Sequence, residues 1–266
     1  MTIHEAPARR RPAIRVAVFG AGGQMGRTVC GAVVAESDLA LVAGIDPGAA
    51  GEVVEGVTLV AEPSGLDGHD VDVVVDFTHV DAARGNLAWA AEHGVHAVVG
   101  TTGFDDRDLD RLRADFTRSN VLVAPNFAIG AVLLMRLAEL AAPWFDSAEV
   151  IELHHDRKVD APSGTATRTV ERMAAASGEW GPDPTRKEVW AGARGAEGPG
   201  GIHVHSVRLR GLVAHQEVLL GTTGQTLTLR HDSYDRSSFM PGVVLAVRRI
   251  AELPGLTIGL DPLLDL

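Results

Sequence analysis

Short apolar runs rich in β-branched residues alternate with stretches of helical periodicity over the first half of the chain. The apolar runs are Ile14–Phe19, Leu39–Ile45, Val71–Val75, Val95–Val99 and Val121–Ala124. The helical stretches are Gln24–Glu36, Ala82–His93, Asp105–Ser119 and Gly130–Ala142. Strands that are apolar throughout are buried on both faces, and helices between them typically connect parallel strands. The pattern therefore predicts an α/β fold with a parallel sheet covered on both sides.

The pattern changes from Val150 onward. Val150–His155 alternates apolar and polar residues, a helix is predicted over Thr165–Ser177, and a long glycine- and proline-rich loop follows. Three further alternating runs, separated by turn residues, favour an antiparallel meander: Ile202–Arg210, Gln216–Leu220 and Thr226–His231. We expect a smaller α+β domain with a mixed four-stranded sheet. Because only one helix would cover this sheet, its open face predicts self-association.

Length and periodicity together suggest two domains. A chain of 266 residues is long enough for two, each with its own core. Helical periodicity returns at Val243–Ala251, after the last alternating run. We therefore assign residues 1–128 and 237–266 to the first domain and residues 129–236 to the second.

Composition excludes several classes of protein. The net charge of −11 offers no basic footprint for nucleic acid. A single cysteine, Cys30, can form neither an internal disulfide nor a cysteine-rich metal site. No apolar stretch approaches the ~20 residues of a membrane span, and the polar N-terminus lacks the apolar core of a signal peptide. We expect a soluble cytoplasmic protein that binds neither nucleic acid nor membranes.

A glycine-rich turn joins the first predicted strand to the first helix. Gly20, Gly23 and Gly26 have the spacing of a GxxGxxG variant of the dinucleotide-binding fingerprint, with Met25 where the usual third glycine stands. Such glycines let the backbone approach a pyrophosphate, and the helix N-terminus supplies free N–H groups. Asp46, after the second strand, could accept the ribose hydroxyls. The glycines alone fit a plain tight turn, but strand, helix and carboxylate together favour a dinucleotide site.

The segment 152–166, which reads ELHHDRKVDAPSGTA, holds the most chemistry. His154 and His155 are neighbours in a strand and point to opposite faces, so they do not easily share a metal, and we predict no metal site. Histidine donates protons readily near neutral pH. Lys158 is one of only two lysines, which indicates that an amine is required for carboxylate binding or acid assistance.

The same segment continues into the start of a helix. Ser163, Gly164 and Thr165 would present backbone N–H groups and a hydroxyl to a substrate carboxylate. An ordinary helix cap preceded by surface polar residues is the alternative. The combination of histidines, lysine and helix start favours proton and anion chemistry.

These motifs carry a resemblance to a known family. The 152–166 segment and GAGGQMG at 20–26 resemble dihydrodipicolinate reductases, also called 4-hydroxy-tetrahydrodipicolinate reductases. Further matches are VDFT at 75–78, VGTTGF at 99–104 and APNF at 124–127. The resemblance spans nearly the whole chain from Ile14, and the double-histidine segment is its most specific part.

The resemblance implies a Rossmann-like dinucleotide-binding domain and a second domain for substrate binding and oligomerisation. It implies reduction of 4-hydroxy-tetrahydrodipicolinate, through dihydrodipicolinate, to tetrahydrodipicolinate in lysine and diaminopimelate biosynthesis. The reductant would be NADH or NADPH, and the assembly a homotetramer. Two alternatives stay open: another nicotinamide-dependent oxidoreductase on the same scaffold, and a non-catalytic dinucleotide sensor.

The resemblance also implies roles for individual residues. His154 would donate the proton, and Lys158 would act as a second acid or carboxylate partner. His155, Gly164 and Thr165 would contact the substrate. The residues implied at the cofactor are Gly20, Ala21, Gly22, Gly23, Gln24, Met25, Asp46, Gly100, Thr101, Thr102, Ala124, Pro125, Asn126 and Phe127.

Cofactor preference follows from charge near the second strand. Pro47 follows Asp46 at a position where some family members place an arginine. No lysine or arginine occurs between Arg27 and Arg84. A 2′-phosphate on the ribose would face a carboxylate without a cation, so we expect NADH to be used at least as well as NADPH.

Overall fold

The computed structural model describes residues 13–66 and 68–266, which form two compact units. Unit 1 contains the chain up to Pro125 and Gly242–Gly259, and unit 2 contains Asn126–Pro241 and Leu260–Leu266. The first two of the three crossings between the units lie a few residues from the boundaries expected from the sequence, but the third, after Gly259, assigns the C-terminal end to unit 2. Leu260 is buried there, and Asp261 forms an ion pair with Arg172 of helix α5 at 2.7 Å. The polar N-terminal dozen lies outside the described residues.

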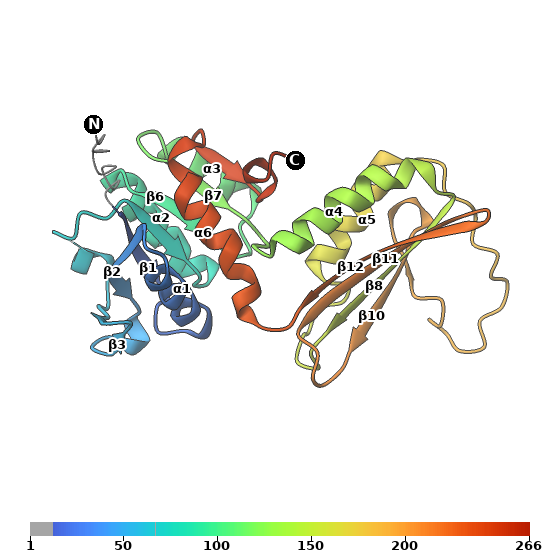
Figure 1. Cartoon of the computed structure of the whole chain (residues 1–266), viewed down its shortest axis with the longest axis horizontal. Helices are drawn as coiled ribbons and strands as arrows, with labels where there is room; N and C mark the ends of the chain where they lie inside the picture. The colour runs from blue at the N-terminus through green and yellow to red at the C-terminus, as the bar shows by residue number, and fades with distance from the viewer. Residues whose placement is uncertain (1–12, 67) are drawn as a thin grey trace, which may run out of the picture. The chain divides into compact units, whose positions relative to one another are not determined.

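Unit 1 is built on a six-stranded parallel sheet with strand order β13-β7-β6-β5-β1-β2 (Figure 1). Its strands are β1 (Ile14–Phe19), β2 (Leu39–Ile45), β5 (Val73–Asp76), β6 (His96–Val99), β7 (Val121–Val123) and β13 (Leu256–Ile258). Its helices are α1 (Gln24–Ala35), α2 (Val80–His93), α3 (Asp106–Asp115) and most of α6 (Met240–Arg249). The parallel α/β sheet predicted from the apolar runs is confirmed.

Both faces of the parallel sheet are buried, as its continuous apolar strands require. On one face Phe19 and Val99 pack in a cluster with Leu87 of α2 and Leu112 of α3. On the other face alternate strand residues such as Val18 are fully buried as well. Three short strands were not predicted in this unit, namely β3 (Val53–Val54), β4 (Val57–Thr58) and β13. Two or three residues are too few to show a period.

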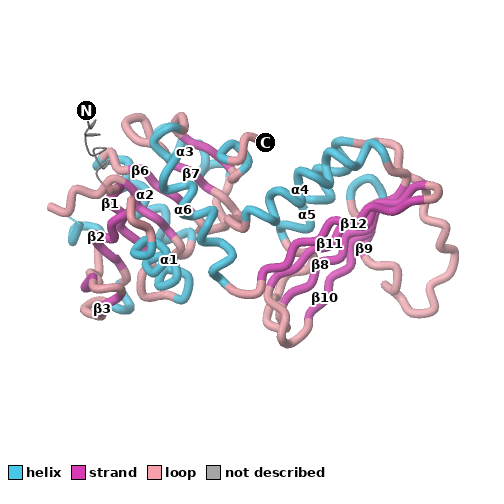
Figure 2. Tube along the Cα trace, viewed as in Figure 1, coloured by secondary structure: helices cyan, strands magenta, loops and turns pink. Residues whose placement is uncertain are grey.

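Unit 2 contains a mixed five-stranded sheet in the order β12-β11-β8-β10-β9 (Figure 2). Its strands are β8 (Ser147–His154), β9 (Ala196–Glu197), β10 (His203–Arg208), β11 (Ala214–Thr222) and β12 (Gln225–Ser233). The predicted mixed sheet is confirmed, with one strand more than the four expected, because the two-residue β9 lies inside the glycine-rich loop.

The predicted meander is wrong in one respect. β11 and β12 form an antiparallel hairpin, but β10 pairs in parallel with β8, which separates it from β11. Alternation shows which face of a strand is buried, and it contains no information about the neighbouring strand. The sequence therefore predicted the strands and their faces but not their order.

Two helices, rather than the predicted one, cover the mixed sheet. Helices α4 (Ile129–Ala141) and α5 (Gly164–Ala176) pack together on the same face, where Leu134 and Met173 contact a core that includes Val150 and Val218. The opposite face of β8 holds half-buried residues such as Ile151. No helix in the described residues is long and apolar enough to cross a membrane.

Replacing Gly26 by alanine should destabilise unit 1. A Cβ at this position would lie 2.0 Å from the carbonyl oxygen of Gly20, so α1 would have to move away from the end of β1. We expect a loss of about 2–4 kcal/mol in the free energy of unfolding. Gly85 is the matched control because it is also helical but exposed, and a Cβ there meets nothing within 4 Å. Gly85→Ala should stabilise by about 0.5–1 kcal/mol. Urea unfolding measures both, and a Gly26→Ala midpoint equal to that of the wild type would contradict the packing.

Candidate active site

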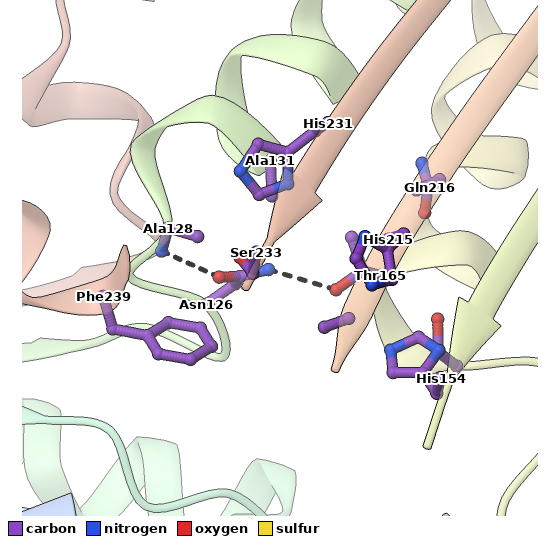
Figure 3. A pocket seen from close by; sticks show the side chains of 12 residues that line it. Asn126, Ala128, Ala131, His154, Thr165, His215, Gln216, His231, Ser233 and Phe239 are labelled. Carbon is purple, nitrogen blue, oxygen red and sulfur yellow. Dashed lines mark hydrogen bonds between the residues drawn. The ribbon is translucent and has the colours of Figure 1, made fainter. Parts of the chain in front are cut away.

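A pocket of about 40 Å³ in unit 2 brings together side chains from β8, β11, β12 and the start of α5 (Figure 3). Its lining residues are Asn126, Ala128, Ala131, His154, Ser163, Thr165, Ala214, His215, Gln216, His231, Ser233 and Phe239. Two residues predicted to meet the substrate, His154 and Thr165, therefore lie in one pocket. Asn126, which the resemblance associated with the cofactor, lies in the same pocket.

The register of the mixed sheet leaves room beside His154. His154 is paired with Arg208 of β10 on one side and with Ala214 of β11 on the other. Ala214 is paired in turn with Ser233 of β12. Cross-strand partners point to the same face of a sheet. The small side chains of Ala214 and Ser233 therefore leave space next to the imidazole.

Glu152 precedes His154 by two residues on the same face of β8 and is fully buried. His154 Nδ1 lies 2.5 Å from Glu152 Oε2, and Arg208 donates to each carboxylate oxygen at 2.8 Å. Burial alone would raise the pKa of Glu152, but the hydrogen bonds from His154 and Arg208 outweigh it and lower the pKa to about 2. The carboxylate is therefore anionic at neutral pH.

The start of α5 presents hydrogen-bond donors. Ser163 is the N-cap, and its Oγ accepts from the Ala166 N–H at 3.2 Å. The backbone N–H groups of Gly164 and Thr165 have no acceptor within the part of the chain that the structure describes. Unpaired N–H groups and the helix dipole together favour an anion at this position. This helix end can bind a carboxylate.

Asn126 and Gln216 are held in defined orientations at the pocket. Asn126 Nδ2 donates to Thr165 Oγ1 at 3.2 Å. Gln216 Nε2 donates to Thr169 Oγ1 at 2.7 Å, and that hydroxyl donates to the Thr165 carbonyl at 2.8 Å. The Thr169 hydroxyl donates its single proton to the Thr165 carbonyl, so it can only accept from Gln216. The side-chain nitrogen of Gln216, rather than its oxygen, therefore faces this hydroxyl. Gln216 Oε1 is buried and has no hydrogen-bond partner among the described residues.

Three of the predicted substrate residues do not line this pocket: His155, Lys158 and Gly164. Lys158 Nζ donates to both oxygens of Asp160 at 2.8 Å. His155 Nδ1 accepts from the Arg157 N–H at 3.2 Å. Neither Glu152 nor Arg208 was selected from the sequence, although Glu152 belongs to the double-histidine segment. No group of three or more histidine, cysteine, aspartate or glutamate residues suited to a metal ion occurs in residues 13–66 and 68–266.

Unit 1 contains a separate cavity of about 500 Å³ at the carboxyl ends of β1, β2 and β5. Its lining residues are Phe19, Gly20, Gly23, Ile45, Asp46, Pro47, Ala61, Glu62, Pro63, Phe77, Thr78, His79, Ala82 and Asn86. Ligands of open α/β sheets bind at this edge. The structure thus places Gly20, Gly23 and Asp46, which were predicted at the cofactor, around one cavity.

The glycine turn is shaped by backbone contacts. Gly20 has a φ of +76°, which favours glycine, and Gly22 donates its N–H to Asp46 Oδ2 at 3.0 Å. No side chain caps α1, and the first-turn N–H groups of Gln24 and Met25 have no acceptor among the described residues. The turn, the open helix end and the cavity fit a dinucleotide pyrophosphate. Ala21, also predicted there, is fully buried beneath the turn.

The segment 100–102 follows β6 and is hydrogen-bonded to the end of β5. The buried Thr101 donates its hydroxyl to Asp76 at 2.7 Å and accepts from the Thr78 N–H at 2.9 Å. Gly100 lies against the Phe77 ring, where a Cβ would come within 2.0 Å. Gly100 and Thr101 thus pack against the residues at the carboxyl end of β5, while Thr102 is exposed.

The segment 124–127 crosses from unit 1 to unit 2. Ala124 and Phe127 are buried, Pro125 is exposed and Asn126 reaches the pocket of unit 2. Of these four predicted cofactor residues, none lines the cavity of unit 1.

Comparison with known proteins covers nearly the whole chain. Residues 14–127 match the family model described as dihydrodipicolinate reductase, N-terminus, and residues 130–264 match its C-terminus. A 4-hydroxy-tetrahydrodipicolinate reductase of Nocardia farcinica is 56% identical over 95% of this chain and 99% of its own length. One of Cutibacterium acnes is 53% identical over the same shares.

Comparison of the fold with solved structures identifies the same group of proteins. The solved structure of a dipicolinate-bound dihydrodipicolinate reductase from Paenisporosarcina sp. TG-14 superposes with a TM-score of 0.83 at 39% identity. The match covers 94% of this chain and 99% of that one. On the family models, the identities and the shared fold, this chain belongs to the dihydrodipicolinate reductase family.

Proposed function

We propose that this chain reduces 4-hydroxy-tetrahydrodipicolinate, through dihydrodipicolinate, to tetrahydrodipicolinate in lysine and diaminopimelate biosynthesis. The observation that carries the proposal is the pocket in which His154 lies beside the open N-terminus of α5. A proton donor next to an anion site suits a cyclic dicarboxylate that must be protonated as it is reduced. The dipicolinate of the Paenisporosarcina structure is a cyclic dicarboxylate of the same class.

Different residues of unit 2 bind the substrate and transfer the proton. His154 donates a proton to the ring carbon adjacent to the one that receives hydride. The Gly164 and Thr165 N–H groups and the Thr165 hydroxyl bind one carboxylate of the substrate. Lys158 exchanges Asp160 for a substrate carboxylate, and His155 assists in binding it.

The residues of unit 1 hold the nicotinamide cofactor. Gly20, Ala21, Gly22 and Gly23 with the first turn of α1 bind the pyrophosphate, and Asp46 accepts the ribose hydroxyls. When bound, the cofactor supplies the hydride. With the proton from His154 and loss of the 4-hydroxyl as water, the overall reaction consumes one NAD(P)H and one proton.

The proposal extends to assembly and location. The half-buried face of the mixed sheet, opposite α4 and α5, supports a homotetramer formed through that face. Cys30, the single cysteine of the sequence, can form no internal disulfide, which supports a reducing, cytoplasmic setting.

Charge around the unit 1 cavity supports the preference for NADH. Asp46 and Glu62 line the cavity, and no lysine or arginine of residues 13–66 and 68–266 does. Arg27, the nearest candidate in the sequence, pairs with Glu52 and donates its Nε to the Gly22 carbonyl at 2.9 Å. The 2′-phosphate of NADPH would therefore enter without a free cation to meet it.

His154→Gln should separate turnover from cofactor binding. Glutamine fills a similar volume but cannot donate a proton as an acid, so kcat should fall by roughly 10²–10⁴-fold. The dissociation constant for NADH, measured by fluorescence, should stay within twofold. His69→Gln, at an exposed histidine, is the control. A His154→Gln enzyme within threefold of wild-type kcat would refute the assignment, whereas a wild type that binds NADH without turnover would indicate a sensor.

Lys158→Met should act on substrate binding. Loss of a charged hydrogen bond of about 1.5–3 kcal/mol should raise KM for the substrate roughly 10–100-fold and leave kcat within about threefold. Lys187→Met, at the only other lysine and exposed, should change neither constant. If KM stays constant, Lys158 does not bind substrate; if kcat falls as far as in His154→Gln, it takes part in protonation.

NADH should be used at least as well as NADPH when kcat/KM is measured for both at one ionic strength. Glu52→Gln releases Arg27 and should improve kcat/KM for NADPH severalfold without changing that for NADH, because the freed guanidinium can meet the 2′-phosphate. A tenfold preference of the wild type for NADPH would show that Asp46 does not discriminate between the cofactors.

A further inference from the structure

We infer that Glu152, together with Arg208, is the positioning residue that makes His154 a proton donor and sets its place relative to the anion site of α5. The inference rests on the proposed function, because it explains how the proposed acid is prepared. Neither residue lines the pocket, so both act through His154 and Ser163.

The hydrogen bonds of Glu152 leave its carboxylate no freedom to turn. Oε1 accepts from Arg208 at 2.8 Å and from the Ser163 N–H at 3.2 Å. Oε2 accepts from the other Arg208 nitrogen at 2.8 Å and from His154 at 2.5 Å. Arg208 is itself anchored to the Asp160 carbonyl at 2.5 Å. A planar fork facing a planar carboxylate fixes orientation as well as charge.

This arrangement decides which nitrogen of His154 serves the substrate. An ionised carboxylate only accepts hydrogen bonds, so the nitrogen facing Glu152, Nδ1, carries a proton. Nε2 is left as the nitrogen available for proton donation. A general acid needs both ring nitrogens protonated, and in that form Nδ1 still donates to Glu152 while Nε2 faces the substrate.

The same carboxylate links the acid to the anion site. Its Oε1 holds the backbone of Ser163, the N-cap residue, while its Oε2 holds the ring of His154. The spacing between proton donor and helix N-terminus is therefore set by one buried side chain. A substrate carboxylate bound at α5 is thereby placed at a defined distance from the donor.

A purely structural role for the ion pair makes a different prediction. Buried ion pairs can often be replaced by apolar side chains without loss of stability, whereas removal of one partner strands a charge. We therefore compare Glu152→Gln with the double variant Glu152→Leu/Arg208→Met. The double variant removes both charges, so it should fold and allow the inference to be tested even if the single variant is unstable.

Both variants should lose kcat by about 10²–10⁴-fold, as when an acid–base histidine loses its orienting carboxylate. The dissociation constant for NADH should stay within twofold, and the double variant should unfold at a urea concentration equal to or above that of the wild type. A folded double variant with wild-type kcat would show that the pair is structural only and would overturn the inference.

Glu149→Gln is the matched control on the same strand. Glu149 also accepts from a histidine, His205, and from both terminal nitrogens of an arginine, Arg194, but it faces the opposite side of the sheet. Because Glu149 lies on the face proposed for assembly, this variant is compared at the same oligomeric state as the wild type, and its kcat should then stay within threefold of the wild type. An equal loss in Glu149→Gln would mean that any break in the sheet lowers activity, which would also overturn the inference.

A measurement without turnover separates this inference from the proposed function. In proton NMR spectra, the His154 Nδ1 proton shared with Glu152 should give a downfield signal that is absent from both His154→Gln and Glu152→Gln. Persistence of that signal in Glu152→Gln would contradict the positioning role even if the reaction is as proposed. Its loss in both variants would uphold the role even if the substrate proves to be a different dicarboxylate.

Discussion

The buried carboxylate of Glu152 is the interaction on which the rest of the candidate site depends. Its desolvation is costly, and hydrogen bonds from His154, Arg208 and the Ser163 N–H compensate for it. Those donors come from two strands and the cap of a helix, so satisfying one charge brings three elements of unit 2 into a fixed arrangement. The same hydrogen bonds to Glu152 therefore stabilise the local fold and position the proposed proton donor.

The candidate cofactor site of unit 1 is built mainly from backbone groups. Where unit 2 orients charged side chains, the glycine turn of unit 1 offers backbone N–H groups and the open end of α1. Asp46 is oriented by the backbone of Gly22 and Gly48 rather than by a cation. This combination of free amides with acidic side chains is the basis of the proposed pyrophosphate site and of the proposed preference for NADH.

Much of the fold could be predicted because apolar patterning reports burial directly. Ile14–Phe19 and Leu39–Ile45 are strands with the predicted bounds, since runs buried on both faces leave little ambiguity. β9 and β13 were missed because two or three residues show no period. The order of β10, β8 and β11 was also missed, because alternation contains no information about which strand lies next to which. Glu152 lay inside the most distinctive segment, yet its role depends on an arginine 56 residues away.

By itself, the sequence determined the α/β class, the resemblance to a reductase family, and the presence of a histidine, a lysine and a helix start within one short segment. These features are local, and spacing along the chain is enough to recognise them. Only the tertiary structure decided that His154 and Thr165 share a pocket with Asn126 while Lys158 is paired with Asp160. It also decided that a buried carboxylate assigns the two nitrogens of His154 to different tasks. Such facts depend on strand register and on partners distant in sequence, because a hydrogen bond forms between atoms that the fold brings within about 3 Å.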